Sequence, residues 1–433
     1  MKKTILSILC CLLLVVSSIC AADSSKTILI QNGTIVSGVG DPIPDADLLI
    51  EKGKISKIGT NLSVPAGAEV IDASGKYIFP GLVAMMTAVG VTGYPGAGND
   101  TDETGISTPH MDPYDAINPE DDCIEVTRIE GVTTVHTVSG SRSVINGKSV
   151  VLHLGGNLAD EMIAKRYVAQ IINIGAKEQN KYPSTQPGVM AYLRAKFDAA
   201  QEYAEKQTQK TEKRTEQKKN DENFAKRNLE LEALIPVVTG KVPVIFITYD
   251  EVTIRNALEL IKEYNLKGVI RAQSGILKYT DRIAKAKIPV IWAGTTGVPL
   301  RWEPHDLNYH TAAVLAEKGV LFAFDPGGWG PGNRNVRNLT EPAAISVAHG
   351  LAQEEAYKAI TLNPAKILGI ADEVGSLEVG KIANVVIWTG CPLQGRSRVE
   401  AVIIKGESIP LASFQTRLYD KYKKIVSDRL NKK

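Results

Sequence analysis

Two patterns of hydrophobic and polar residues divide this chain. From Thr27 to Ile78, apolar and polar residues alternate and are interrupted by glycine-containing turns, and the same pattern returns in 375–388 and 399–406. Alternation with a period of two predicts short antiparallel strands that bury one face. Strand-rich segments at both ends, around a different middle, indicate one small β-sandwich domain built from both chain ends.

The middle of the chain alternates short apolar runs with helical stretches. This is the pattern of βα units around a parallel sheet, whose strands are covered on both faces. Length and alternation predict a distorted (β/α)8 TIM barrel with active-site positions at the carboxyl ends of its strands. A doubly wound open sheet would show similar strands, but it explains the two β-rich ends less simply. Seven strands are recognisable, so an eighth is hidden or the barrel is irregular: Leu82–Ala88, Val132–Val138, Val150–Leu154, Val242–Thr248, Gly268–Ala272, Pro289–Ala293 and Val320–Phe324.

These patterns set the expected domain boundaries. The charged stretch 194–232 carries both signs at helical spacing, which favours a solvated helical insertion over a partner-binding arm. The expected units are a leader at 1–22, the first part of the β-sandwich at 24–79, the barrel at 80–373, the second part of the β-sandwich at 374–411 and a C-terminal helix at 412–433.

The N-terminus has the features of a secretory signal peptide. Lys2 and Lys3 precede an apolar run, Ile5 to Val16, that is too short to cross a bilayer, and small residues follow it. Simple cleavage is favoured over lipid attachment at Cys20, because a large residue stands where the lipidation motif has a small one. The mature protein is therefore expected to be secreted and periplasmic.

Composition removes several classes of function. Only Cys123 and Cys391 of the five cysteines remain after the leader, so the core and not a disulfide framework must supply stability. The formal net charge is +2, which gives no electrostatic footprint for nucleic acid. No transmembrane segment is expected in the mature chain.

Four stretches resemble the amidohydrolase superfamily, and its secreted imidazolonepropionase-like branch in particular. They are 78–83 at the entry to the barrel, 109–118 in the loop after the first barrel strand, 131–135 in the second strand, and 359–386 at the exit to the β-domain. They are spread over the whole mature chain. The resemblance implies a TIM barrel and metal-dependent hydrolysis of C–N bonds.

The metal-binding motif of that superfamily is altered in this chain. The first barrel strand of the family carries Asp-x-His-x-His, and the corresponding positions here are Ala84, Met86 and Ala88. Alanine has no donor atom, and the methionine thioether suits Cu(I) better than zinc or manganese. The resemblance places Ile247 and Ala272 at the histidines of the fifth and sixth strands, and neither can bind a metal.

One acidic residue remains for the position after the last strand. Asp325 is the candidate catalytic residue, although ungapped counting places Gly327 at the family position. A catalytic zinc usually takes three protein ligands and lowers the pKa of its water to about 7. One aspartate cannot hold such an ion, so no metal ligand and no cofactor are assigned; zinc or manganese is expected only if the site is remodelled.

Other polar residues could bind a ligand. His136 lies in the second barrel strand, His110 lies in an acid-rich loop, and a simple structural role is open for each. The glycine-rich segment 325–337 follows the last strand, where it could hold an anionic or carbonyl ligand or serve as a mobile lid. The substrate-binding candidates are His110, His136, Tyr249, Arg271, Trp329 and Arg334.

Three hypotheses follow for the function. The first is a secreted amidohydrolase-fold protein without its metal site, which acts as a binding or partner subunit for a catalytic paralogue or for a second copy of itself. The second is an active amidohydrolase that hydrolyses a cyclic amide or related C–N bond through a remodelled site using Asp325 or His136. The third is a periplasmic receptor for a small molecule. Metal content and turnover distinguish the first two.

Overall fold

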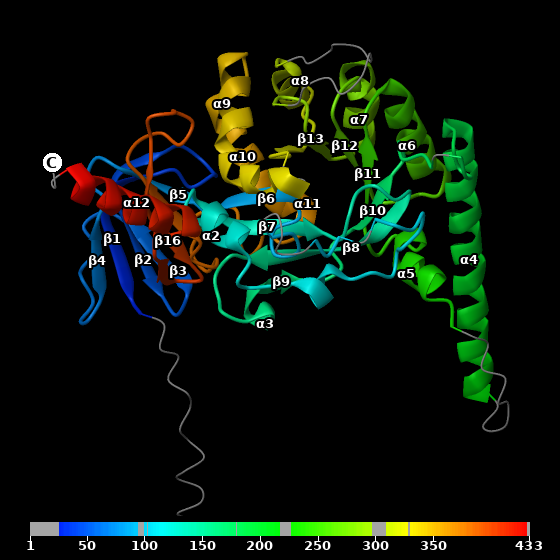
Figure 1. Ribbon diagram of the computed structural model, residues 1–433, viewed down its shortest axis with the longest axis horizontal. Helices are drawn as coiled ribbons and strands as arrows, with labels where there is room; N and C mark the ends of the chain where they lie inside the picture. The colour runs from blue at the N-terminus through cyan, green and yellow to red at the C-terminus, as the bar shows by residue number, and fades with distance from the viewer. Residues whose placement is uncertain are drawn as a thin grey trace, which may run out of the picture.

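The computed structural model describes residues 26–93, 99–101, 103–178, 180–216, 227–296, 309–327 and 330–430. The predicted leader and Trp329 lie outside these residues, as does the side chain of Arg334. A sheet built from both chain ends packs beside a barrel surrounded by helices (Figure 1). This architecture confirms the predicted α/β fold, with a separate terminal β-domain and a near-closed, distorted barrel.

The β-domain is one eight-stranded sheet in the order β17-β16-β15-β5-β1-β2-β3, with β4 paired to β1. Ile78 of β5 pairs with Ile35 of β1 on one side and with Ile387 of β15 on the other. The N-terminal and C-terminal segments are therefore joined at β5 and β15. The strands are β1 (Ile28–Ile35), β2 (Ile43–Glu51), β3 (Lys54–Gly59), β4 (Glu69–Asp72), β5 (Tyr77–Pro80), β15 (Val385–Trp388), β16 (Val399–Ile404) and β17 (Glu407–Ile409).

The barrel sheet follows the order β14-β13-β12-β11-β10-β8-β7-β6, with β9 paired to β8. Neighbours from β10 to β14 run parallel, as do β6 and β7, but β8 is antiparallel to both β7 and β10. The strands are β6 (Leu82–Thr87), β7 (Val132–Val138), β8 (Ile145–His153), β9 (Ile163–Lys165), β10 (Gln170–Asn173), β11 (Val244–Thr248), β12 (Gly268–Ala272), β13 (Val290–Trp292) and β14 (Phe322–Phe324).

The reversed strand explains why the barrel is irregular. Only residues 139–144 connect β7 to β8, whereas a parallel crossover needs a dozen or more residues. The short connection forces an antiparallel return, so the expected parallel strand at Val150–Leu154 is part of a longer antiparallel strand. The hidden eighth strand is β10, whose polar end residues Gln170 and Asn173 interrupt the apolar signal.

Alternate residues of the strands face two different apolar layers. One buried cluster takes residues from all eight strands of the barrel path and lies inside the barrel: Val83, Met85, Met86, Val138, Val151, Ile171, Ile245, Ile247, Val269, Ile291 and Ala323. Their strand neighbours pack against the surrounding helices; Ile270, Val290 and Phe322, for example, share a cluster with Ile254 of α6 and Ile283 of α7. Strand alternation thus separates a barrel interior from an outer layer.

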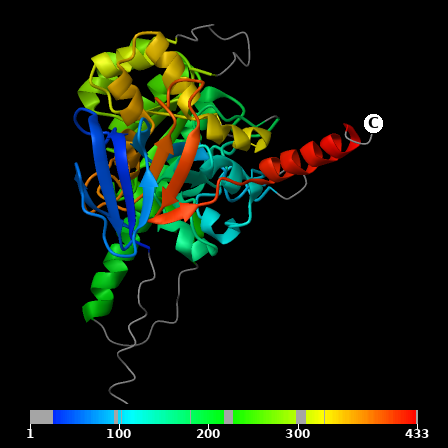
Figure 2. The same ribbon diagram turned by 90° about the vertical axis from the view of Figure 1, so that its left-hand side faces the viewer.

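The helices cover the outside of the barrel and extend from it. The long helix α4 and the C-terminal helix α12 project from the body (Figures 1 and 2), and α12 contains no buried residue. Among the described residues, no helix combines the length and the apolar character needed to span a bilayer. The helices are η1 (Pro113–Ala116), α2 (Asp122–Arg128), α3 (Ala159–Met162), α4 (Gln186–Glu216), α5 (Leu229–Val238), α6 (Glu251–Glu263), η2 (Ile276–Tyr279), α7 (Thr280–Ala286), α8 (Thr311–Glu317), η3 (Gly330–Asn338), α9 (Thr340–Ala348), α10 (Gln353–Ala359), α11 (Leu362–Leu368) and α12 (Phe414–Leu430).

The first and last barrel strands, β6 and β14, are in contact but are not paired as strands. The corner between α10 and α11 bridges their amino-terminal ends, because Ile360 O accepts from Val83 N at 2.9 Å and Asn363 Nδ2 donates to Phe322 O at 3.0 Å. Backbone groups that a closed barrel would pair between strands are therefore satisfied by this corner.

Gly81 should be intolerant of a side chain, because it lies at the junction between β5 and β6. A Cβ there would clash with the side chain of Thr133 on β7. We expect Gly81→Ala to lower the free energy of unfolding by about 1–3 kcal/mol through overpacking. Gly395→Ala is the matched control, since nothing lies within 4 Å of its added Cβ. Thermal unfolding followed by circular dichroism measures both; equal melting temperatures would contradict the close packing of Gly81 against Thr133.

Candidate functional site

A buried ion pair lies at the carboxyl ends of the last barrel strands. Asp325 directly follows β14, and Arg271 is the fourth residue of β12. Arg271 Nε donates to Asp325 Oδ2 at 2.8 Å, and the exposed fractions of the two side chains are 9% and 0%. The backbone N–H of Gly327 donates to Asp325 Oδ1 at 2.8 Å. Both carboxylate oxygens are therefore engaged by donors of the protein itself.

Strand alternation brings Arg271 into the barrel. Val269, two residues earlier, belongs to the interior cluster, whereas Ile270 and Ala272 pack in the outer layer against helices. Side chains two apart on a strand share a face, so Arg271 points inward with Val269. Ala272, the position expected for the sixth-strand histidine, faces the helices. The inward position at this end of β12 belongs to Arg271.

A cleft of 440 Å³ opens beside this ion pair. Among the described residues, the guanidinium of Arg271 makes one hydrogen bond, through Nε, and Arg271 lines the cleft, so its Nη groups can donate to a ligand there. Glu341 offers an acceptor on the same wall. The cleft is lined by Arg271, Gln273, Ala293, Thr296, Pro326, Gly327, Asn335, Asn338, Glu341 and Pro342. It therefore presents donors and acceptors together, within a size range that suits small molecules.

His136 lies on β7 with its side chain fully buried in the protein. Its Nδ1 accepts from the backbone N–H of Met86 at 3.3 Å, which makes Nε2 the protonated nitrogen. Within the described part of the chain, Nε2 has no hydrogen-bond partner. Burial lowers the pKa of His136 to about 3, so the ring is neutral at ordinary pH. The residue does not line the cleft.

The other sequence candidates are dispersed. Tyr249 follows β11 and its hydroxyl accepts from Asn173 Nδ2 at 3.1 Å, while His110 is exposed in a turn; neither lines the cleft. Trp329 lies outside the described residues, and Arg334 belongs to η3 without a described side chain. The structure thus brings together Arg271 and Asp325 from the candidates, and it adds Glu341 and the neighbouring amides.

The carboxyl end of β6 makes structural contacts. Met86 has a positive φ of 56°, a conformation that costs a non-glycine residue free energy, and its N–H is held by His136. The N–H of Ala88 donates to Asn333 Oδ1 at 3.1 Å, and Asn333 Nδ2 donates to Thr92 O at 3.2 Å. The buried Asn333 was missed by sequence reasoning, since an asparagine in a glycine-rich segment carries no specific signal.

Among the described residues of the barrel mouth, the side chains at the expected ligand positions do not form the three-ligand set of a catalytic zinc. Ala84 packs in the outer layer, Met86 and Ile247 are interior apolar residues, and Asp325 is committed to Arg271 and Gly327. Within the described residues, one group of three side chains has ligand atoms close enough together to hold a metal ion, Asp121, Asp122 and Cys123. Asp121 accepts from Gly90 N and Cys123 N, so it caps α2.

A near-closed barrel with a polar cleft at its carboxyl end, joined to a β-domain from both chain ends, has the architecture of the amidohydrolases. A model of the amidohydrolase family matches residues 304–409. A solved amidohydrolase from Thermotoga maritima MSB8 aligns with a TM-score of 0.80 and 29% identity, over 88% of this chain and 99% of that chain. The protein is a member of the amidohydrolase superfamily.

Two curated relatives are similar over different lengths. Amidohydrolase tasK from Hapsidospora irregularis is 24% identical over 417 residues, which are 85% of this chain and 42% of that protein. D-hydantoinase from Geobacillus stearothermophilus is 60% identical over 55 residues, 13% of this chain and 11% of that protein. The chain therefore spans less than half the length of each of these relatives.

Removing one partner of the ion pair should cost more than removing both. Arg271→Met would leave a buried carboxylate without its cation, and we expect a loss of about 3–5 kcal/mol in the free energy of unfolding. The double variant Arg271→Met/Asp325→Asn removes both charges and keeps an oxygen for Gly327 N–H, so most of that loss should be restored. Denaturant unfolding of the wild type, both single variants and the double variant gives the coupling; additive losses would contradict a coupled pair.

The buried histidines should make the protein less stable in acid. Burial lowers the pKa of His136 to about 3, and burial with the Lys405 charge lowers that of His153 to about 4. The unfolded histidines bind protons below about pH 6.5. The free energy of unfolding should therefore fall as pH drops from about 6.5 toward these values, by up to about 1.4 kcal/mol per pH unit for each histidine.

His136→Asn tests this dependence, because asparagine can still accept from Met86 N–H without titrating. We expect a shallower decline of the melting temperature between about pH 7.5 and about pH 4.5 than in the wild type. The exposed His110→Asn is the control and should follow the wild type. An unchanged slope in His136→Asn would show that His136 is not the titrating group.

Proposed function

We propose that this protein is a non-catalytic amidohydrolase-fold protein that binds a small molecule at the mouth of its barrel. The observation that carries the proposal is the buried pair of Arg271 and Asp325, in which each oxygen of the acid after the last strand accepts from a donor of the protein. On this proposal the metal ligands of the superfamily have been lost, at Ala84, Met86, Ala88, Ile247 and Ala272.

Electrostatics supports this proposal. A divalent cation bound to Asp325 would lie within a few ångströms of the Arg271 guanidinium. At about 4 Å and an effective dielectric constant of about 20, the repulsion between a double and a single positive charge is about 8 kcal/mol. Arginine cannot lose its proton to relieve this repulsion. Without a metal, a water molecule keeps a pKa near ~15.7 and is a poor nucleophile at neutral pH.

The chemistry of the cleft supports a ligand of the cyclic amide class. A cyclic amide or ureide carries carbonyl oxygens and N–H groups on one small, rigid frame. Arg271, Asn335 and Asn338 can donate to its carbonyl oxygens, and Glu341 can accept from its N–H. Such a ligand would use the same end of the barrel at which this architecture binds substrates, with recognition retained and hydrolysis absent.

The signal-peptide pattern at 1–22 supports a secreted, periplasmic location as a further part of the proposal. A protein that binds a ligand without turnover could act as a subunit of a larger assembly. The proposed partner is either a catalytic paralogue or a second copy of this chain. Light scattering of the purified mature protein measures its mass; a mass of two or more chains supports self-association, and a monomer excludes the second copy as partner.

Metal content and turnover test the central proposal. After equilibration with zinc and manganese and removal of free ions, we expect elemental analysis to find well below one ion per chain. A panel of cyclic amides and ureides should raise the melting temperature by mass action without product formation. Glu341→Gln should reduce this shift, whereas Glu400→Gln, on the β-domain, should leave it unchanged.

Two outcomes would contradict the proposal. One bound ion per chain that is lost in Asp325→Asn would show that the acid serves a metal after all. Metal-free hydrolysis of a C–N bond, abolished in Asp325→Asn, would favour an active amidohydrolase with a remodelled site.

A further inference from the structure

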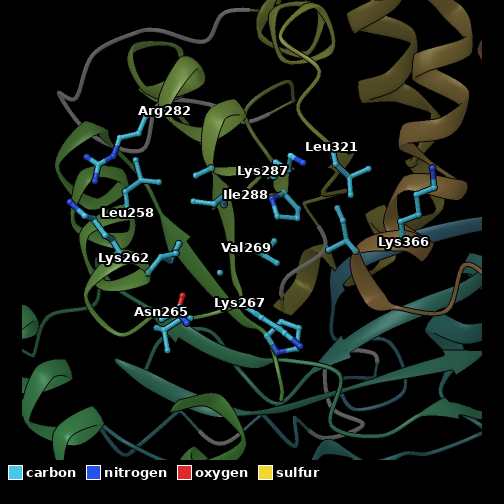
Figure 3. Close-up of a pocket in the computed structure, with 17 residues that line it drawn as sticks. Leu258, Lys262, Asn265, Lys267, Val269, Arg282, Lys287, Ile288, Leu321 and Lys366 are labelled. Atoms are coloured by element: carbon cyan, nitrogen blue, oxygen red, sulfur yellow. The ribbon is translucent and has the colours of Figure 1, made fainter. Parts of the chain in front are cut away.

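A second hollow lies at the opposite end of the same strands. Its volume is 600 Å³, and it is formed where β12 begins and just before β11, β13 and β14 begin, between α6, α7 and α11. Figure 3 shows basic side chains from several elements around an apolar centre that includes Val269 and Ile288. This basic pocket is defined by Lys262, Lys267, Arg282, Lys287 and Lys366, together with the apolar residues between them.

The charges of this pocket are of one sign. Within the described part of the chain, no aspartate or glutamate lines it. Two acidic residues of the adjoining helix α6 are held in ion pairs, because Glu259 binds the lining residue Arg282 at 2.7 Å and Glu263 binds Arg194 at 3.0 Å. Among the described residues, Arg282 is the one basic lining residue that has an ion-pair partner. Four lysines therefore share a concave surface without a counter-charge in its lining.

The elements that carry these lysines are fixed by the fold. Lys262 is in the last turn of α6, Lys267 precedes β12, Lys287 ends α7 in a left-handed conformation, and Lys366 is on α11. The helix dipole favours a basic residue near a helix C-terminus, and this explains the individual positions of Lys262 and Lys287. The helix dipole does not explain why Lys267 and Lys366, which belong to other elements, line the same pocket.

From this convergence we infer that the basic pocket binds a small polyanion. The lysine side chains are exposed around an apolar floor, so they can turn toward a bound anion and form charge-assisted hydrogen bonds with it, in a contact that added salt would weaken. The floor, with Val269, Ile288 and Leu321, would accept the carbon skeleton of the ligand. The ligand class is therefore a compact organic anion with two or more negative charges, a polycarboxylate or a phosphate ester.

This site is independent of the cleft at the barrel mouth. The cleft is lined by residues after the carboxyl ends of β12 to β14, and the pocket by residues at their amino ends, with no residue in common. Active-site positions of this architecture lie at the carboxyl ends. The pocket therefore serves a second ligand, whatever occupies the cleft.

The test uses citrate and pyrophosphate as probes of the two anion classes, with sodium chloride at equal ionic strength as the reference. Titration calorimetry of the mature protein should show saturable binding of at least one probe, weakened by added salt. The triple variant Lys262→Gln/Lys267→Gln/Lys287→Gln should weaken it by about tenfold or more, since it removes three positive charges that can form charge-assisted hydrogen bonds with the anion.

A matched triple variant controls for total charge and for folding. Lys57→Gln/Lys206→Gln/Lys423→Gln removes the same charge from exposed positions on β3, α4 and α12, and it should bind as the wild type does. Both triple variants should keep the circular dichroism spectrum of the wild type. Binding of neither probe at millimolar concentration, or equal weakening in the two triple variants, would overturn the assignment. Lys366→Gln alone is a milder variant that tests the same pocket if the first triple variant does not fold.

Discussion

The organisation of the barrel mouth depends on the charge pair between Arg271 and Asp325. The two residues come from β12 and from the end of β14, so the pair ties together strands that are separated by β13 in the sheet. Burying both charges carries a desolvation cost that only close pairing and further hydrogen bonds can offset. The N–H of Gly327 supplies such a bond and thereby fixes the turn after β14. The same turn shapes the cleft, because its residues Pro326 and Gly327 line the cleft wall.

The two halves of the barrel have different structural roles. The half from β6 to β10 contains the antiparallel strand β8 and faces the β-domain, where Asn384 Nδ2 donates to His153 Nδ1 at 3.2 Å. His153 also contacts Thr134 Oγ1 at 3.2 Å, so a buried polar network joins barrel and β-domain. The half from β11 to β14 is parallel and carries the cleft at one end and the basic pocket at the other. The half that contains the antiparallel strand therefore contacts the β-domain through side-chain hydrogen bonds, and the parallel half carries the candidate binding sites.

The sequence predicts apolar strands better than it predicts the direction in which their side chains point. The strands Val132–Val138 and Gly268–Ala272 were predicted to the residue, because each is a compact run bounded by turn signals. β10 was hidden because half of its residues are polar, and β8 was expected to run parallel because its short connection was not weighed. At the site, Arg271 and Asp325 could be named from their places at strand ends. Their pairing could not, since it depends on which face of β12 is turned inward.

The end of β6 is held by structural contacts to other parts of the barrel. Here the N–H groups of Met86 and Ala88 bind His136 and Asn333, and the side chains of these two residues are apolar and buried. The positive φ of Met86 is a strained conformation that persists because these contacts fix it. On the proposed function, histidines at these two positions would therefore not be enough for a metal site, because their side chains would replace buried apolar ones on a backbone whose conformation these contacts fix.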